Sequence, residues 1–241
     1  EMDIFKSGQM LNMPNIKLNQ FYGIELDDFA HEVAILSLWL AEHQMNQEFK
    51  KLFGNCTPTL PLKDSGNIVC GNATRLDWEE VCPKNEGDEI YILGNPPYLG
   101  ARLQTKEQKE DMNIVFDGID GFNNLDYISC WFYKATKYLQ NYSKNQFAFV
   151  STNSITQGTQ VSLLWSHLLN NDIEISFAHQ SFKWTNNAKN NAGVVVVIIG
   201  LRNKKNTPKY IFNKEIKIQS KNINPYLIDA DNIYIKDSKV N

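Results

Sequence analysis

Short apolar runs alternate with longer amphipathic stretches along most of this chain. A short apolar run bounded by Gly, Pro or Asn predicts a strand, whereas apolar residues recurring every three or four positions predict a helix. These patterns predict strands at residues 21–25, 68–70, 89–93, 147–150, 173–178 and 193–200, and helices at 29–40, 125–142 and 161–169. Strands that alternate with helices predict an α/β protein with a mostly parallel sheet and helices on both faces.

The last two predicted strands are the exception to parallel pairing. Residues 180–192 between them show no helical periodicity, and a parallel pair needs a crossover of about a dozen residues, usually a helix. We therefore expect residues 193–200 to form an antiparallel last strand. The four valines and two isoleucines of this segment indicate a strand that is buried on both faces.

Two other segments carry specific expectations. The predicted helix at 29–40 places Phe29, Val33, Leu36 and Leu40 on one side, which predicts a single buried face. Residues 99–124 are mostly polar and contain two glycines, so they read as a long loop. Long loops in compact domains are usually functional.

The composition places the chain among ordinary globular proteins. Its 241 residues, 42% hydrophobic and 21% charged, suit one large domain or one domain with an appendage. No apolar run reaches membrane-spanning length and no signal peptide is present, so no membrane partner is expected. The spacing of Cys56, Cys70, Cys82 and Cys130 matches neither a disulfide framework nor a zinc site, which predicts a cytoplasmic location and no metal.

The net charge of −3 is unevenly distributed. Residues 202–221 hold seven basic side chains against the single acid Glu215. A local basic stripe of this kind is what contacts with nucleic-acid phosphates require. A solvated surface of a lysine-rich protein explains the same stripe equally well, so both interpretations stay open.

The most distinctive motif is Asn95-Pro96-Pro97-Tyr98, which directly follows the strand predicted at 89–93. An aromatic amine is a poor nucleophile because its lone pair is delocalised into the ring. The Asn95 side-chain carbonyl and the Pro96 backbone carbonyl could both accept hydrogen bonds from such an amine and draw it toward tetrahedral geometry. Tyr98 could stack on the ring, which is worth about 1–3 kcal/mol per base. A simple proline turn is the alternative.

Other polar residues end strands at the same predicted sheet edge. Glu25 ends the strand at 21–25, and Gly71-Asn72 follow the strand at 68–70. Ligands of open parallel sheets bind beyond the carboxyl ends of the strands, and an acid after the second strand of a dinucleotide-type fold can hold two ribose hydroxyls. Any strand can end in an acid, so Glu25 alone is a weak signal.

Asn95-Pro96-Pro97-Tyr98 after a hydrophobic strand resembles the catalytic signature of S-adenosylmethionine-dependent amino-methyltransferases, chiefly the DNA adenine-N6 enzymes. The flanking segments 21–25, 38–40, 71–78, 151–158 and 182–184 resemble the methyltransferase core of the MmeI-like (type IIL/IIG) restriction–modification enzymes. The resemblance runs from about Gln20 to Leu201. It implies a Rossmann-like methyltransferase fold over residues 1–201, followed by a basic connector at 202–241 that leads toward a target-recognition domain.

The resemblance also implies roles for individual residues. Asn95, Pro96, Pro97 and Tyr98 would be catalytic and would hold the target base. The cofactor S-adenosyl-L-methionine would be bound by Glu25, Asn72, Ala73 and Trp131, and the target base or DNA by Phe182 and Lys183. Many relatives have aspartate where this chain has Asn72, and Trp131 is equally well explained as a residue of the helix core.

The resemblance further implies double-stranded DNA as a partner, together with nuclease and target-recognition domains of the same parent polypeptide. The glycine-rich loop that holds the cofactor in this family has no counterpart in residues 1–20, and the chain begins with Glu1. We therefore expect an amino-terminally truncated fragment that is inactive alone and binds the cofactor weakly or not at all. Two alternatives remain, a protein glutamine N-methyltransferase and a non-catalytic scaffold.

Overall fold

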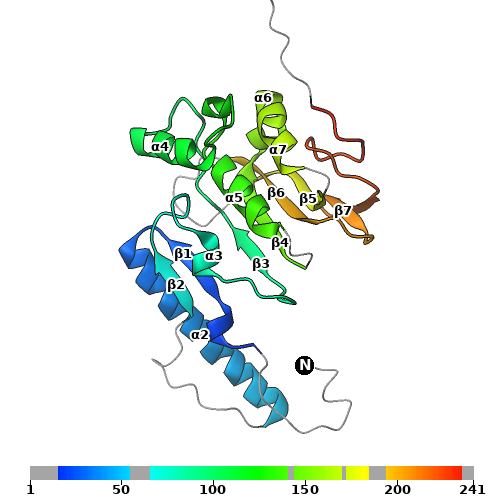
Figure 1. Cartoon of the computed structure of the whole chain (residues 1–241). Helices are drawn as coiled ribbons and strands as arrows, with labels where there is room; N and C mark the ends of the chain where they lie inside the picture. The colour runs from blue at the N-terminus through cyan, green and yellow to red at the C-terminus, as the bar shows by residue number, and fades with distance from the viewer. Residues whose placement is uncertain (1–15, 55–65, 141–143, 170–171, 185–193, 235–241) are drawn as a thin grey trace, which may run out of the picture. The chain divides into compact units, whose positions relative to one another are not determined.

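The computed structural model describes residues 16–54, 66–140, 144–169, 172–184 and 194–234 (Figure 1). The chain divides into two compact units, which we call unit 1 (residues 1–83) and unit 2 (residues 84–241). Among the described residues, no helix combines the length and apolar character that crossing a lipid bilayer requires.

Unit 1 contains a parallel pair of strands, β1 (Tyr22–Glu25) and β2 (Asn67–Cys70). Its long helix α2 (Asp28–Phe53) contacts both strands, and the short helix α3 (Trp78–Val81) contacts β1. A one-turn 3₁₀ helix, Leu18–Gln20, precedes β1. The Asp27 carboxylate caps α2 by accepting the Ala30 N–H at 2.9 Å, and Gly54 ends the helix with a φ of +83°. These are the ordinary start and stop signals of a helix.

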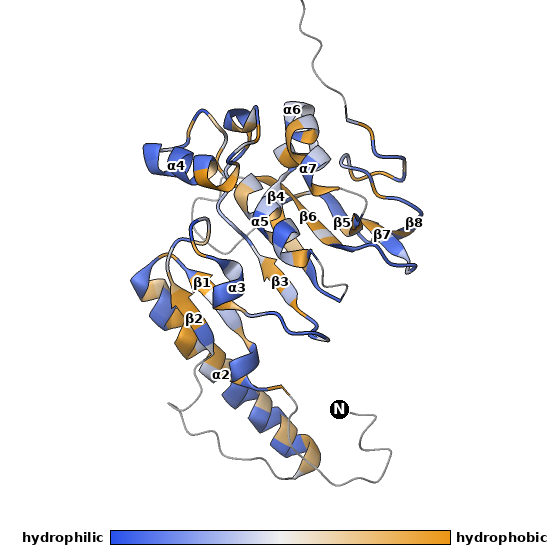
Figure 2. Cartoon of the chain, in the orientation of Figure 1, coloured by the Kyte–Doolittle hydropathy of each residue, from blue (hydrophilic) through white to orange (hydrophobic). Residues whose placement is uncertain are grey.

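The expectation of a buried face on α2 is wrong for this chain. The helix buries none of its residues fully, and Phe29, Val33, Leu36 and Leu40 are all exposed, Phe29 to 77%. Figure 2 shows apolar and polar colours alternating along α2. The spacing of apolar residues correctly predicted a helix. An apolar helix face is buried, however, only where another part of the structure covers it.

Unit 2 is built on a six-stranded sheet with strand order β3-β4-β6-β5-β7-β8. The strands are β3 (Tyr91–Gly94), β4 (Gln146–Thr152), β5 (Ile173–Lys183), β6 (Val195–Asn203), β7 (Lys209–Asn213) and β8 (Ile216–Ser220). The β3–β4 and β5–β7 pairs are parallel, whereas β6 is antiparallel to both β4 and β5. The predicted antiparallel pair is therefore confirmed, and the α/β class is confirmed with a sheet that is mixed rather than mostly parallel.

The helices of unit 2 are α4 (Lys106–Val115), α5 (Ser129–Leu139) and a segment running through α6 (Gly158–Gln160), a π-helical turn (Val161–Trp165) and α7 (Ser166–Leu168). Two 3₁₀ turns, Phe122–Asn124 and Asn153–Thr156, complete the unit. Helix α4 corrects the prediction of a loop over 99–124. It begins with a capping box in which Thr105 and Gln108 exchange side-chain to backbone hydrogen bonds, a signal present in the sequence.

One face of the unit 2 sheet is buried where β4 and β6 pair. Residues that pair across β4 and β6, such as Phe147 with Leu201 and Phe149 with Ile199, are almost inaccessible. Helix α5 lies on this face (Figure 1), and its Phe132 ring meets Phe147, Phe149 and Trp165 at centroid distances of 5.4–6.1 Å. On the opposite face, Ala148, Val150 and Ile198 are half-buried, but Val196 and Gly200 of β6 are buried. The expectation that the strand is buried on both faces is therefore met over Val196–Gly200 except at Ile198.

The sheet continues past the predicted domain boundary at residue 201. That position lies inside β6, and β7 and β8 extend the same sheet beyond β5. Gly200 is required where β6 meets β5, because a Cβ there would lie 2.2 Å from the Phe177 ring. The first part of the predicted connector is thus integral to unit 2.

Candidate functional site

The Asn95–Tyr98 segment leaves the sheet at the carboxyl end of β3. Parallel pairing of Gly94 with Phe149 fixes the last residue of the strand, and the chain then runs without regular structure through residue 100. Pro96 is buried, Tyr98 is half-buried, and Asn95 and Pro97 are exposed. Among the described residues, no hydrogen bond engages the Asn95 side chain or the Pro96 carbonyl. The clamp predicted from the sequence is therefore anchored by a buried proline ring and keeps both acceptors available.

A buried carboxylate fixes the residue that follows the clamp. The Asp126 side chain is 5% exposed, and its Oδ1 accepts the Leu99 N–H at 2.8 Å and the Ile128 N–H at 3.3 Å. The Leu99 carbonyl in turn accepts the Tyr127 N–H at 3.0 Å. Burial raises the pKa of the Asp126 carboxyl, while the backbone hydrogen bonds from Ile128 and Leu99 oppose that rise.

Two glutamines complete this anchor. The Gln104 Nε2 donates to the carbonyls of Leu99 at 3.2 Å and Leu125 at 3.0 Å. Gln160 joins α6 to the same place, because its Oε1 accepts the Asp126 N–H at 3.0 Å and its Nε2 donates to the Asn124 carbonyl. None of these three polar residues was predicted from the sequence. Asp126 could have been identified from the sequence, because it is a charged residue inside the apolar run Leu125–Ile128.

The strand register brings Phe182 to the same edge of the sheet as the clamp. Val196 of β6 lies level with Thr152 of β4 on one side and with Phe182 of β5 on the other. Because β3 is parallel to β4, Gly94, Thr152 and Phe182 all end their strands at one edge. Phe182 is three strands from β3, about 14 Å at the usual strand spacing, so it shares this edge without touching Tyr98. Phe182 and Lys183 are both exposed there.

The predicted cofactor residues of unit 1 also share an edge. Glu25 ends β1 level with Cys70, and the Gly71 N–H donates to the Glu25 carbonyl at 2.7 Å. The Asn72 Oδ1 accepts both the N–H and the hydroxyl of Thr74, at 2.9 and 2.7 Å. This turn fixes the Asn72 side chain after the end of β2. The Asn72 amide oxygen already accepts two hydrogen bonds from within the turn.

The remaining predicted cofactor residues lie in different units. In unit 1, the Ala73 carbonyl accepts the Trp78 indole N–H at 2.8 Å, which fixes the backbone after Asn72. In unit 2, Trp131 is a half-buried residue of α5 whose ring meets the edge of Tyr127 at a centroid distance of 5.2 Å. Trp131 is therefore only partly a core residue, and its ring lies next to the residue that holds Leu99.

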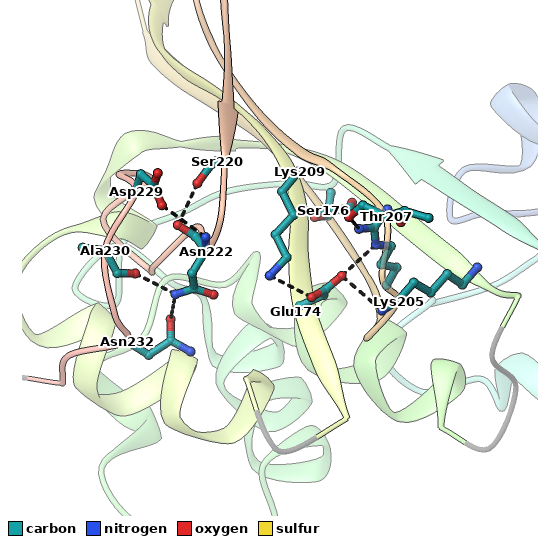
Figure 3. A network of polar contacts seen from close by, with 12 residues as sticks. Glu174, Ser176, Lys205, Thr207, Lys209, Ser220, Asn222, Asp229, Ala230 and Asn232 are labelled. Carbon is teal, nitrogen blue, oxygen red and sulfur yellow. Dashed lines mark hydrogen bonds and ion pairs between the residues drawn. The ribbon is translucent and has the colours of Figure 1, made fainter.

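The basic segment 202–221 is largely a structural feature near β5 (Figure 3). Glu174, 7% exposed, forms ion pairs of 2.9 Å with both Arg202 and Lys209. The Lys217 ammonium lies 3.8 Å from the centre of the Tyr210 ring. Glu174 was not predicted as a partner because it lies outside the basic segment, 28 residues upstream of Arg202.

The residues after β8 form a second polar network in Figure 3. The Asn222 Nδ2 donates to the Ala230 carbonyl at 2.6 Å and to the Asn232 Oδ1 at 3.3 Å. The Asn222 N–H donates to Asp229, whose exposed carboxyl has a lowered pKa, chiefly because of this hydrogen bond. Residues 222–232 thus fold back on themselves, and the Leu227 carbonyl accepts a bond from Gln180 of β5.

The α/β sheet is that of a Rossmann-like methyltransferase domain. Residues 1–213 match the family described as the MmeI DNA-methyltransferase domain, and the chain belongs to this family. This confirms the resemblance inferred from the sequence motifs.

Individual relatives agree with this assignment. The chain is 53% identical over 232 residues to DNA methyltransferase A of Bacillus subtilis (strain 168), covering 95% of this chain and 26% of that protein. Its fold is similar to that of the type IIL restriction-modification enzyme MmeI, solved in complex with DNA. That match has a TM-score of 0.83 and 42% identity, and covers 91% of this chain and 30% of the MmeI chain. The chain therefore spans about a quarter of the curated relative it matches.

Proposed function

We propose that this chain holds the target base of a DNA adenine-N6 methyltransferase that uses S-adenosyl-L-methionine. The observation that carries the proposal is the clamp at the end of β3. Asn95 presents an exposed amide without a hydrogen-bond partner among the described residues, and buried Pro96 fixes the neighbouring carbonyl. Two adjacent acceptors beside an aromatic ring suit a flat heterocycle that carries an amine.

The chemistry asked of these residues is positioning. The Asn95 Oδ1 and the Pro96 carbonyl would each accept one N–H of the adenine amine, which localises the nitrogen lone pair. S-adenosyl-L-methionine would supply an electrophilic methyl group on a sulfonium. The two acceptors would hold the amine nitrogen while its lone pair bonds to the methyl group and the methyl–sulfur bond breaks, and one amine proton would then pass to solvent water. Holding the amine in line with the methyl group provides the rate enhancement.

The residues of unit 1 fit part of the cofactor. Glu25 at the carboxyl end of β1 can accept hydrogen bonds from two ribose hydroxyls. Asn72 fits the adenine amine less well, because its Oδ1 already accepts two bonds from Thr74. Ala73 and Trp131 remain proposed as pocket walls. The Asn72 contact is the weakest of the four on this structure.

Access to an adenine in a duplex requires the base to leave the stack, which costs roughly a few kcal/mol. Phe182 and Lys183, at the same sheet edge as the clamp, are proposed to face the target base or its strand. Of the basic segment, the exposed Lys204, Lys214 and Lys221 are the candidates for phosphate contacts, since Arg202 and Lys209 pair with Glu174. Nuclease and target-recognition regions are proposed for the parent polypeptide.

Tritiated methyl transfer by the full-length protein, with duplex DNA and with protein as acceptors, tests the proposal. Asn95→Ala should lower transfer to DNA by at least about 100-fold, because one of the two acceptors is lost at the reacting nitrogen. Asn113→Ala, an exposed asparagine on α4, is the matched control and should retain wild-type transfer. Nucleoside analysis of the DNA should show N6-methyladenine.

Unchanged activity of Asn95→Ala would refute the role of the clamp. Methylation of glutamine in protein, with none in DNA, would establish the alternative substrate class for the same four residues. Absence of transfer to either acceptor by the wild-type protein would support a non-catalytic scaffold.

A further inference from the structure

The backbone of Leu99 is held at both of its polar groups. Its N–H donates to the buried Asp126 carboxylate at 2.8 Å, and its carbonyl accepts the Tyr127 N–H at 3.0 Å and the Gln104 side chain at 3.2 Å. Leu99 directly follows Tyr98, so the peptide that ends the clamp is fixed by partners on a separate segment of the chain. A residue in an irregular loop that is held in this way cannot shift without breaking buried hydrogen bonds.

Asp126 is the centre of this arrangement. Its Oδ1 joins Leu99 to the Ile128 N–H at the start of α5, and its own N–H is held by Gln160 from α6. Helix α5 carries Phe132 into the aromatic core of unit 2. The carboxylate therefore connects the loop that contains Asn95 and Tyr98 to that packed core.

We propose that Asp126 is a positioning residue for methyl transfer, acting through the Leu99 backbone to set the orientation of Tyr98 and the acceptors before it. This inference rests on the proposed function of the clamp. A buried carboxylate is a costly group to keep unless it is hydrogen-bonded, and an apolar side chain would fill the same space without that cost. Its use here is explained by the backbone N–H that it fixes.

The test is steady-state kinetics of the full-length protein with tritiated S-adenosyl-L-methionine and adenine-containing duplex DNA. Asp126→Ala should lower kcat by about 10- to 100-fold, since small misplacements of reacting groups have effects of that size. KM for DNA and for the cofactor should change by less than about threefold. Asp126→Asn should restore kcat to near the wild-type value, because the amide keeps the Oδ1 acceptor for Leu99.

Glu174→Ala is the matched control. Glu174 is a similarly buried carboxylate of unit 2, 7% exposed, but it pairs with Arg202 and Lys209 rather than with a backbone group of the clamp loop. It should lose thermal stability like Asp126→Ala while keeping wild-type kcat. An equal loss of kcat in the two alanine variants would make Asp126 merely structural and overturn the inference. So would wild-type kcat in Asp126→Ala, or a kcat in Asp126→Asn as low as that of the alanine variant.

If Asp126→Ala does not fold, the same kinetics are measured on Gln104→Leu and Asp126→Asn instead. Gln104→Leu removes the side-chain donor to the Leu99 carbonyl, so a lowered kcat at unchanged KM supports the inference and wild-type kcat overturns it. The wild-type protein separates the two proposals. A wild type that methylates no adenine overturns the proposed function and the inference together, whereas an active wild type with an equally active Asp126→Ala overturns the inference alone.

Discussion

Units 1 and 2 are both built from strands with helices beside them, and they differ in how much apolar surface they bury. Among the described residues of unit 1, Leu18 alone is a fully buried hydrophobic residue. Unit 2 buries an aromatic cluster around Phe132 together with aliphatic residues from β4, β5 and β6. Parallel strands are normally covered on both faces, and an isolated pair of strands is marginally stable at best. Unit 1 therefore has the local signals of its fold without a core of its own.

The same contrast extends to the two halves of the proposed site. The clamp at Asn95–Tyr98 is fixed through Asp126 to a packed core, whereas Glu25 and Asn72 lie on a two-stranded sheet whose helix is exposed. Burial also fails at both edge strands of unit 2, where Leu93 of β3 is 82% exposed and Ile216 of β8 is 64% exposed. Local rigidity is thus predicted to be high for the target-base residues and low for the cofactor residues.

The largest difference should come from truncating an aromatic ring in each unit. Phe132→Ala removes a fully buried ring that contacts Phe147, Phe149 and Trp165, and should lower the free energy of unfolding by about 3–5 kcal/mol. Phe29→Ala removes a ring that is 77% exposed and should change it by less than about 0.5 kcal/mol. Urea denaturation followed by circular dichroism measures both. Equal losses would mean that α2 is covered in solution and would break the comparison.

A smaller difference should come from removing one glutamate in each unit. Glu174→Gln leaves Arg202 and Lys209, both nearly buried, without their shared carboxylate, which should cost about 3 kcal/mol. Glu48→Gln breaks the exposed pair with Lys51 on α2 and should cost at most about 1 kcal/mol. Denaturation at low and high salt checks this. Only the Glu48 effect should fade with salt, and a large, salt-sensitive loss at Glu174 would place that pair in solvent instead.

The strands were predictable because their signals are local. Short apolar runs located all six predicted strands, and the missing crossover correctly indicated an antiparallel β5–β6 pair. The clamp was found for the same reason, since Asn95–Tyr98 is contiguous in sequence. The exposure of Phe29 and Leu36 was not predictable, because the spacing of apolar residues identifies a helix face but not whether another surface covers it.

The residues that sequence reasoning missed act across long separations. Asp126 bonds Leu99, which is 27 residues away, and Glu174 bonds Arg202, which is 28 residues away. These partners are brought together by the packing of α5 and by the register of the strands. Neither the packing nor the register can be predicted from the local sequence pattern. Helix α4 is the instructive exception, because Thr105 and Gln108 carried its start signal within a segment that looked too polar to be a helix.

The smallest expected effect is a pH dependence confined to unit 2. His179 of β5 stacks on Phe212 of β7, with ring centroids 4.5 Å apart, and partial burial lowers the pKa of its imidazole. Between the ordinary value of about 6.5 and that lowered value, the unfolded chain binds a proton that the folded chain does not. Wild-type stability should therefore fall as pH drops below about 6.5 and level off once the folded state is also protonated.

His179→Phe keeps the ring stack and removes the titration. The difference in free energy of unfolding between the variant and the wild type should be constant above about pH 7 and should grow in favour of the variant as the pH falls toward 5. Groups common to both proteins cancel in this difference, so it isolates His179. Parallel curves from pH 8 to pH 5 would show that His179 is as solvated in the folded chain as in the unfolded one. The β5–β7 pairing would then be open to water, and the tight packing that distinguishes unit 2 from unit 1 would end at β5.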